Sequence, residues 1–159
     1  MIIQIDTREH KYELARVQRQ LDRLGVKTIN SKLYVGDYQS LDNPRLVIDR
    51  KKDLNELCSN VCQQHDRFRR ELIRAQEAGI QIIILCEHGE DVGCLEDVYF
   101  WENPRLLQSP RAVSGHGLYK SLCTIRDRYD VRFEFCSKRE TGKRIIELLG
   151  GVADAQEER

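Results

Sequence analysis

The chain has 159 residues, 40% of them hydrophobic and 33% charged, which suffices for one globular domain with a core but not for two. Its 26 Lys and Arg residues balance 26 Asp and Glu residues, so net charge predicts no partner, and nucleic-acid binding would need a local basic patch. No apolar run approaches the ~20 residues that cross a bilayer, which excludes a membrane-spanning protein.

The first third of the chain predicts one helix among short strands. The stretch 1–6 predicts a strand that ends at Asp6, and apolar residues at helical spacing predict a helix over 10–25 that ends at Gly25. Three more strands are expected, with a turn at 41–44 before the last of them. They cover 26–30, 32–40 and 45–51.

The remainder of the chain predicts mainly helices with two further strands. A helical pattern covers 54–75, either as one helix or as two with a break near Ser59-Asn60, and Gly79 ends it. The run 80–87 predicts a buried strand, and 95–100 predicts a helical turn within the least periodic region. The closing elements are a helix over 115–129, an alternating strand over 131–136 and a helix over 138–151.

This order of elements predicts the α/β class, with a central mixed β-sheet flanked by helices on both faces. One domain is expected over 1–150, followed by a disordered tail over 151–159. The N-terminal sequence lacks the basic segment and long apolar stretch of a secretory signal. Six cysteines without such a signal favour reduced thiols and a cytoplasmic location.

Acidic residues gather around the first predicted strands, at Asp6, Glu9, Asp37 and Asp49. Asp49 and Lys51 are two apart on one predicted strand, so their side chains leave the same face about 6.6 Å apart, and Arg50 leaves the other face. A hairpin with the preceding strand would bring Asp37 beside Asp49.

Paired carboxylates repel each other unless a cation neutralises them. Mg²⁺ suits such a pair because it typically takes one or two carboxylates together with waters and phosphate oxygens. A lysine beside the metal can hold or activate a water, and the metal polarises a scissile phosphate. The spacing therefore indicates phosphodiester cleavage, although acid-x-lysine also occurs by chance and a surface hairpin with solvated charges explains it as well.

Three motifs follow one another in a specific order: "IDTRE" at 5–9, "VGDY" at 35–38 and "IDRKKDLNEL" at 48–57. In this order the chain resembles, from Ile3 to about Leu149, the nuclease domain of the XPF/Mus family of structure-selective endonucleases. That family is part of the PD-(D/E)xK, restriction-endonuclease-like superfamily, and its signature is G-D, a spacer, E-R-K, three residues and D. The resemblance implies a Mg²⁺- or Mn²⁺-dependent endonuclease that acts on branched or flap DNA in repair or recombination.

The resemblance also implies roles for individual residues. Asp37 and Asp49 would be the two metal-ligating acids, and Lys51 would be the catalytic lysine. The family's usual Glu is Asp49 here, one methylene shorter, but the superfamily motif accepts either acid.

The N-terminal motif supplies a second group of residues. Asp6 and Glu9 match the acidic pair of the family's "DxRE" motif and would flank the metal as further ligands. Arg8, together with Arg50, would organise these acids or contact phosphate.

Two departures from the family pattern bear on function. The last Asp of the signature falls on Asn55, with Asp53 and Glu56 nearby as substitutes. No helix-hairpin-helix module follows the closing helix, so the chain looks like a stand-alone nuclease domain, as in compact bacterial or phage versions. It would then need a second copy or a helix-hairpin-helix partner for affinity.

The alternative function is a catalytically inactive module that binds DNA or scaffolds a repair or recombination partner. Asn55 is the only feature that favours it.

Three further features have competing interpretations. Arg67, Arg70 and Arg74 recur at helical spacing and either track a phosphate backbone or form a solvated helix face. Cys58, Cys62 and His65 share a helical face and could ligate zinc, but the same positions continue an apolar stripe, which is the favoured interpretation. The predicted long loop over 101–116 either engages DNA or is merely mobile.

Apolar residues of the last strand and helix would provide the dimer surface, by analogy with the family.

Overall fold

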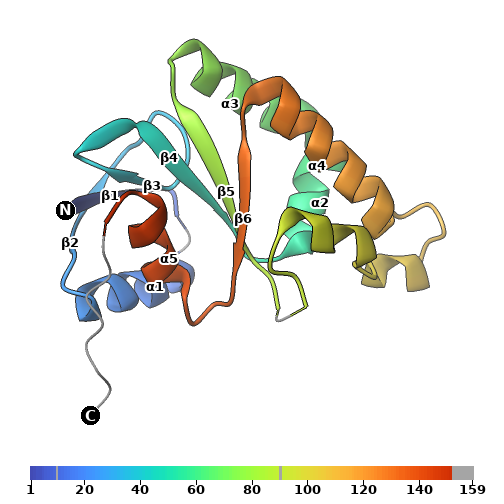
Figure 1. Ribbon diagram of the computed structural model, residues 1–159, viewed down its shortest axis with the longest axis horizontal. Coiled ribbons are helices and arrows are strands. Elements are labelled where there is room, and N and C mark those ends of the chain that lie inside the picture. Colours follow the sequence, from blue (N-terminus) through green and yellow to red (C-terminus); the bar gives the residue numbers. More distant parts are fainter. Residues whose placement is uncertain (10, 90, 152–159) are drawn as a thin grey trace.

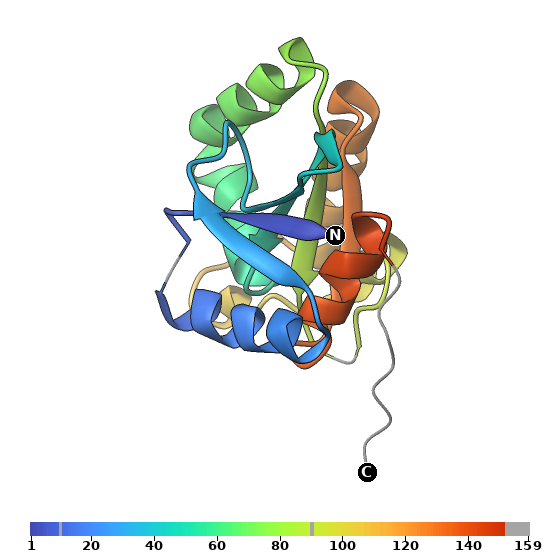
Figure 2. The same ribbon diagram turned by 90° about the vertical axis from the view of Figure 1, so that its left-hand side faces the viewer.

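The computed structural model describes residues 1–9, 11–89 and 91–151. Within these ranges six strands form one mixed sheet in the order β2-β1-β3-β4-β5-β6, with helices on both faces (Figures 1 and 2). The predicted α/β fold class is thereby confirmed. The tail expected over 151–159 falls, from residue 152 onward, outside the described residues.

The first half of the sheet is built around β1 (Ile2–Asp6), which pairs in parallel with β2 (Lys27–Ser31) after the intervening helix α1 (Lys11–Arg23). On its other side β1 pairs antiparallel with β3 (Tyr38–Ser40). A tight hairpin then leads from β3 into β4 (Asn43–Lys51). The hairpin thus connects the edge half of the sheet to its centre.

The second half of the sheet is parallel. β4 pairs with β5 (Gln81–Glu87), which pairs with β6 (Arg132–Cys136). The connecting elements are α2 (Leu54–Cys62), α3 (His65–Glu77), the 3₁₀ segments η1 (Leu95–Phe100) and η2 (Pro104–Leu107), α4 (Gly115–Tyr129) and the closing helix α5 (Thr141–Leu148).

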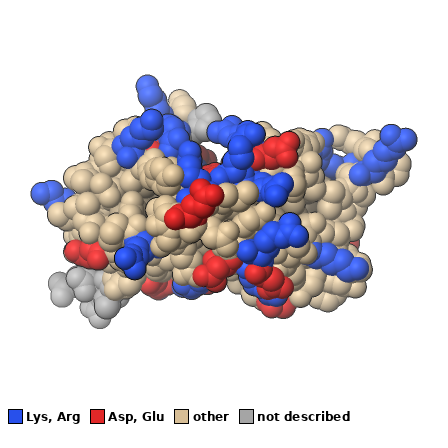
Figure 3. All heavy atoms as spheres, turned by 90° about the horizontal axis from the view of Figure 1, so that it is seen from above, with Lys and Arg blue, Asp and Glu red and all other residues tan. Residues whose placement is uncertain are grey.

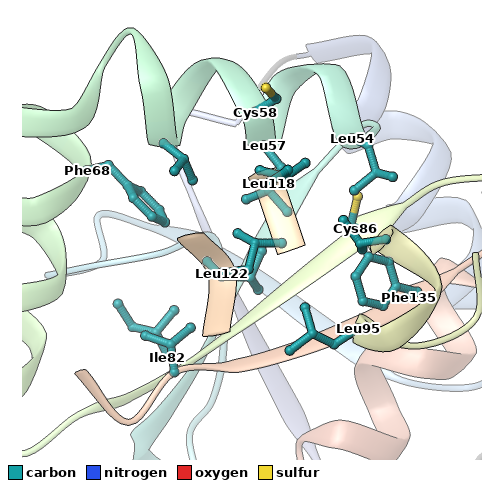
Figure 4. Close-up of a cluster of buried hydrophobic side chains, with 14 of the residues drawn as sticks. Leu54, Leu57, Cys58, Phe68, Ile82, Cys86, Leu95, Leu118, Leu122 and Phe135 are labelled. Carbon is teal, nitrogen blue, oxygen red and sulfur yellow. The ribbon is translucent and has the colours of Figure 1, made fainter. Parts of the chain in front are cut away.

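Alternating residues of the central strands feed two separate cores. Val47 and Ile82 point to the face covered by α2, α3 and α4, where Leu54, Phe68 and Leu122 meet them (Figure 4). The residues next to Val47 on β4 and next to Ile82 on β5 point to the opposite face. There they pack, together with buried residues of β1, against α1 and α5. This alternation follows from the period of two along a strand, and burial on both faces explains why β5 is apolar from Ile82 to Cys86.

The predicted strand over 32–40 is wrong for its first six residues. Side chains satisfy part of the backbone there, since Asp6 Oδ1 accepts from the Leu33 amide at 2.8 Å and Glu71 Oε1 accepts from the Gly36 amide at 3.2 Å. Asp37, at the end of the stretch, bonds instead to the backbone of β1 and β4. Gly36 also has a φ of +71°, which a strand does not accommodate. Residues 32–37 therefore form a loop, called here the Asp37 loop, and only Tyr38–Ser40 is a strand.

The break in the long helical pattern falls after Cys62, not near Ser59-Asn60 as predicted. Asn60 stays helical because its side-chain amide donates to the Glu56 carbonyl at 2.8 Å, while its oxygen accepts from Lys51 Nζ. The polar Ser-Asn pair is visible in the local sequence, but the hydrogen bond that Lys51 donates to Asn60 is not.

The expected long loop over 101–116 is more ordered in structure than predicted, since it contains η2 and the first residues of α4. The buried Asn103 donates to the Val113 carbonyl at 2.8 Å and accepts from the Arg105 amide at 3.0 Å. Arg105 and Arg111 are exposed. Among the helices of the described residues, none is both long enough and apolar enough for a membrane span.

The apolar residues of β6 and α5 do not form the surface that was expected for a dimer. Phe135, Ile145, Ile146 and Leu148 are all buried within this chain. They complete the two cores described above.

Candidate active site

A hollow of about 1040 Å³ lies between the Asp37 loop and helix α3. Its lining comes from segments that are far apart in sequence: the end of β1, the Asp37 loop, the end of β4, and helices α2 and α3. Lys and Arg side chains gather around a hollow in the view of Figure 3. The hollow brings together the residues that the sequence analysis proposed for the site: Asp6, Arg8, Glu9, Asp37, Asp49, Arg50, Lys51, Arg67, Arg70 and Arg74.

Asp37 is held rigidly between β1 and β4. Its backbone amide donates to the Ile48 carbonyl at 2.8 Å, and its carbonyl accepts from the Asp6 amide at 2.8 Å. Its carboxylate accepts a third bond of 2.8 Å, from the Arg50 amide. Burial, followed by the nearby Asp49 and Glu9 carboxylates, raises the pKa of Asp37 well above its ordinary value. The site therefore concentrates negative charge that requires a cation.

Asp49 and Lys51 share one face of β4, as the strand period predicts. Lys51 Nζ lies 3.1 Å from Asp49 Oδ1 and 2.9 Å from Asn60 Oδ1. Burial alone would lower the pKa of Lys51, but the Asp49 and Asp37 carboxylates outweigh it and the pKa is raised. Lys51 is thus a cation at neutral pH, held against the acids by α2.

Arg50 leaves β4 on the opposite face and is almost fully buried. Its guanidinium lies 2.9 Å from Glu9 Oε1 and 3.3 Å from Glu87 Oε2. Glu87, itself buried, also accepts from Arg16 at 2.6 Å and from Thr141 at 2.8 Å. Of the two roles expected for Arg50, the structure favours organising the acids, because the 5% exposure of its side chain leaves no access to a phosphate.

Asp6 and Glu9 both have structural partners. Asp6 accepts from the Leu33 amide and, at 2.7 Å, from Arg8 Nε. Although burial would raise the pKa of Asp6, these hydrogen bonds hold it below its ordinary value. Glu9 is bound by Arg50 as described. Both acids therefore hold other parts of the site in place, Asp6 the Asp37 loop and Glu9 the Arg50 side chain. Their expected role as metal ligands stays a prediction.

Glu71 on α3 is a site residue that the sequence analysis does not single out. Its carboxylate accepts from the Gly36 amide, which ties α3 to the Asp37 loop. Burial, followed by Asp49, raises the pKa of Glu71. No local signal distinguishes it, because the contact joins residues 35 positions apart.

The three α3 arginines lie at the rim of the hollow, above its acids. Arg67, Arg70 and Arg74 are exposed and line it, together with the buried Phe68 of the same helix. Arg8 is also at the rim, with a side chain that is 55% exposed. The arrangement gives an acidic floor with a basic rim, which suits a polyanion that meets a bound cation.

Asn55 lines the hollow at the start of α2. The two acids considered as substitutes are engaged elsewhere: Asp53 accepts from the Glu56 amide at 2.8 Å, and Glu56 accepts from the Lys52 amide at 2.7 Å. Both therefore stabilise the beginning of the helix. Asn55 consequently keeps an oxygen, without a charge, at this position.

The donor set fits a hard divalent cation. Two carboxylates that repel each other, the half-buried Asp37 and the buried Asp49, offer the one or two protein ligands that Mg²⁺ usually takes, with waters and phosphate completing the shell. No cluster of three or more His, Cys, Asp or Glu residues placed to cage a metal occurs in the described ranges. The same finding gives no support to zinc at Cys58, Cys62 and His65, and Cys58 belongs to the apolar core.

Gly36 is required beside Asp37 for two reasons, and its replacement by alanine should separate them. A Cβ there would strain the positive φ and collide with the Val47 side chain and the Ile48 carbonyl. Gly25 has a φ of +72° with nothing within 4 Å, so Gly25→Ala is a matched control that carries only the backbone strain, about 1–2 kcal/mol.

Urea unfolding of both variants measures the difference. We expect Gly36→Ala to lose roughly 1–3 kcal/mol more unfolding free energy than Gly25→Ala, because the neighbouring strand must shift. Equal losses would show that the close approach to β4 is not needed.

Comparison with known proteins agrees with this architecture. The model of the ERCC4 domain family matches residues 5–149. Curated protein sequences give no match. Among solved structures, XPF from Aeropyrum pernix superposes with a TM-score of 0.66 at 21% identity, covering 94% of this chain and 63% of that one. The same protein in complex with DNA gives a TM-score of 0.66 at 21% identity, covering 93% of this chain and 62% of that one. The chain thus spans less than two thirds of that XPF chain, and at this identity the superposition shows a shared fold.

Proposed function

The chain belongs to the ERCC4 domain family of structure-specific DNA nucleases, and from this premise we propose that it is a divalent-metal-dependent endonuclease that hydrolyses branched or flap DNA. One observation carries the proposal. The half-buried Asp37 and the buried Asp49 lie in one hollow beside the charged Lys51, under a rim of exposed arginines. A neutral or scattered set of residues would not serve phosphodiester hydrolysis.

Asp37 and Asp49 would hold Mg²⁺ or Mn²⁺. When bound, such an ion polarises the scissile phosphate and lowers the pKa of a water. Lys51, fixed by Asp49 and Asn60, would donate a hydrogen bond to the attacking water or to a phosphate oxygen and stabilise the charge that develops there.

The other residues of the hollow would support these three. Asp6 and Glu9 would position the Asp37 loop and Arg50. Arg67, Arg70, Arg74 and Arg8 would neutralise phosphates along the bound strand.

A cleavage assay on flap, splayed-arm and linear duplex DNA tests the proposal, with Mg²⁺, Mn²⁺ or EDTA. We expect cleavage that needs the metal and falls by at least about 10²-fold in Asp49→Asn, because the ligand charge is lost. Asp42→Asn, an exposed change at the β-hairpin turn, is the control and should keep activity. Cleavage that survives EDTA, or that is unchanged in Asp49→Asn, would contradict the proposal.

A catalytically inactive DNA-binding module is the second candidate, and Asn55 in the lining of the hollow is the observation that favours it. It predicts binding of the same substrates without cleavage under either metal. Restored cleavage in Asn55→Asp would assign the loss to this residue.

Two further parts of the proposal concern the setting of the protein. We propose that a second copy or a helix-hairpin-helix protein adds affinity for branched DNA, which light scattering with and without DNA would detect as a change in mass. The six cysteines are free thiols, which suits the proposed cytoplasmic location in a bacterium or a phage-infected cell.

A further inference from the structure

Tyr34 is a large aromatic residue that stands in solvent beside the proposed site. It is 59% exposed, whereas its neighbours Leu33 and Val35 are buried and anchor the Asp37 loop. It lies three positions before Asp37 in sequence, so their Cα atoms are at most about 11 Å apart. The ring belongs to neither of the two hydrophobic cores described above.

Arg74 of α3 holds Tyr34 in position through two contacts. Its guanidinium lies over the tyrosine ring, 5.1 Å from the centroid, and its Nη2 donates to the Tyr34 carbonyl at 2.9 Å. Arg74 itself lines the hollow with Asp37 and Asp49. Because Glu71, one turn earlier on α3, binds the Gly36 amide, the loop that carries Tyr34 is fixed to the helix at two points.

We propose that Tyr34 and Arg74 form a stacking platform for an unpaired nucleobase next to the phosphate that is cut. The inference rests on the proposed function, since it assigns a substrate feature to the same site. A base in a duplex is covered by its neighbours, whereas a base in a single-stranded arm can leave the stack and lie on an aromatic ring. The platform would therefore favour DNA with an unpaired arm over continuous duplex.

The size of the effect can be anticipated from the stacking of single bases. Alanine substitution at such aromatic residues weakens binding by about 5- to 150-fold for each base. The exposed arginines at the rim, Arg67 and Arg70, bind phosphates equally well with or without a base. A comparison of arms with and without bases therefore measures the contribution of the platform to affinity separately from that of the arginine charges.

The test compares two DNA probes that differ only in their bases: a duplex with a short single-stranded thymidine arm, and the same duplex with an abasic arm. Fluorescence anisotropy in EDTA gives the affinity for each probe without cleavage. We expect the wild-type protein and Tyr34→Phe to prefer the thymidine arm by at least about 5-fold. Tyr34→Ala should bind both probes alike.

Phe100→Ala serves as the control, since Phe100 is 79% exposed on η1 and its ring contacts Tyr99, whereas Tyr34 contacts Arg74 in the lining of the hollow. It should keep the wild-type preference. No preference in the wild-type protein, or an unchanged preference in Tyr34→Ala, would overturn the proposal. If the protein prefers the thymidine arm but does not cleave DNA in Mg²⁺, the proposed activity is refuted and the platform is supported. If it cleaves DNA without preferring the thymidine arm, the platform is refuted and the proposed activity is supported.

Discussion

Lys51→Ala is expected to reduce DNA cleavage by about 10²–10³-fold, the usual cost of losing one preorganised donor at a reacting centre. The ammonium of Lys51 lies 3.1 Å from Asp49 and is fixed by Asn60, so it sits beside the proposed metal ligands without being one. Its removal should leave divalent binding and DNA affinity mostly intact. Single-turnover cleavage of a flap substrate in Mg²⁺ measures the effect.

Lys120→Ala is the matched control for this variant. Lys120 is exposed on α4 and does not line the hollow, so the same loss of charge should leave cleavage unchanged. Equal cleavage rates in Lys51→Ala and the wild-type protein would remove Lys51 from the mechanism.

Arg50→Met is expected to lower the free energy of unfolding by about 3 kcal/mol. Arg50 is buried between Glu9 and Glu87, and removing it takes one ion-pair contact from each carboxylate in a poorly hydrated site. Arg16 still binds Glu87, which places the loss at the lower end of the range for a broken buried ion pair. Urea unfolding monitored by circular dichroism gives the value.

Arg45→Met on the same strand provides the comparison. Arg45 is exposed, so this substitution should change stability by no more than about 0.5 kcal/mol. Similar losses for the two variants would mean that the buried network around Arg50 adds nothing to stability beyond the arginine stem.

The parts of the fold that could be predicted are those with a local signal. The helix at 115–129 has Ser114 as its N-cap, whose hydroxyl accepts from the Gly117 amide, and its bounds were predicted correctly. The period of two placed Asp49 and Lys51 on one face, and the hairpin brought their strand against β3. These features depend on neighbours in sequence, which is why sequence reasoning captures them.

The parts that were missed depend on contacts between distant segments. Glu71 reaches the Gly36 amide, and Asp6 reaches the Leu33 amide, so a stretch with strand-like residues becomes a loop. Contacts of the same kind decide between the two roles expected for Arg50, organising the acids or contacting phosphate. Neither the periodicity nor the motif order contains this information, since each partner lies more than 25 residues away.

The most direct test of the central claim, that Asp37 and Asp49 together form a divalent cation site, is the shift in the thermal unfolding midpoint when Mg²⁺ is added. A cation that binds only the folded state stabilises it, so the wild-type midpoint should rise with Mg²⁺ concentration. Asp37→Asn keeps an oxygen that accepts from the Arg50 amide, but it removes a negative charge that repels the Asp49 and Glu9 carboxylates. It should therefore match or exceed the wild-type midpoint without metal and respond only weakly to Mg²⁺. An equal rise in Asp37→Asn, or no rise in the wild-type protein, would contradict the claim.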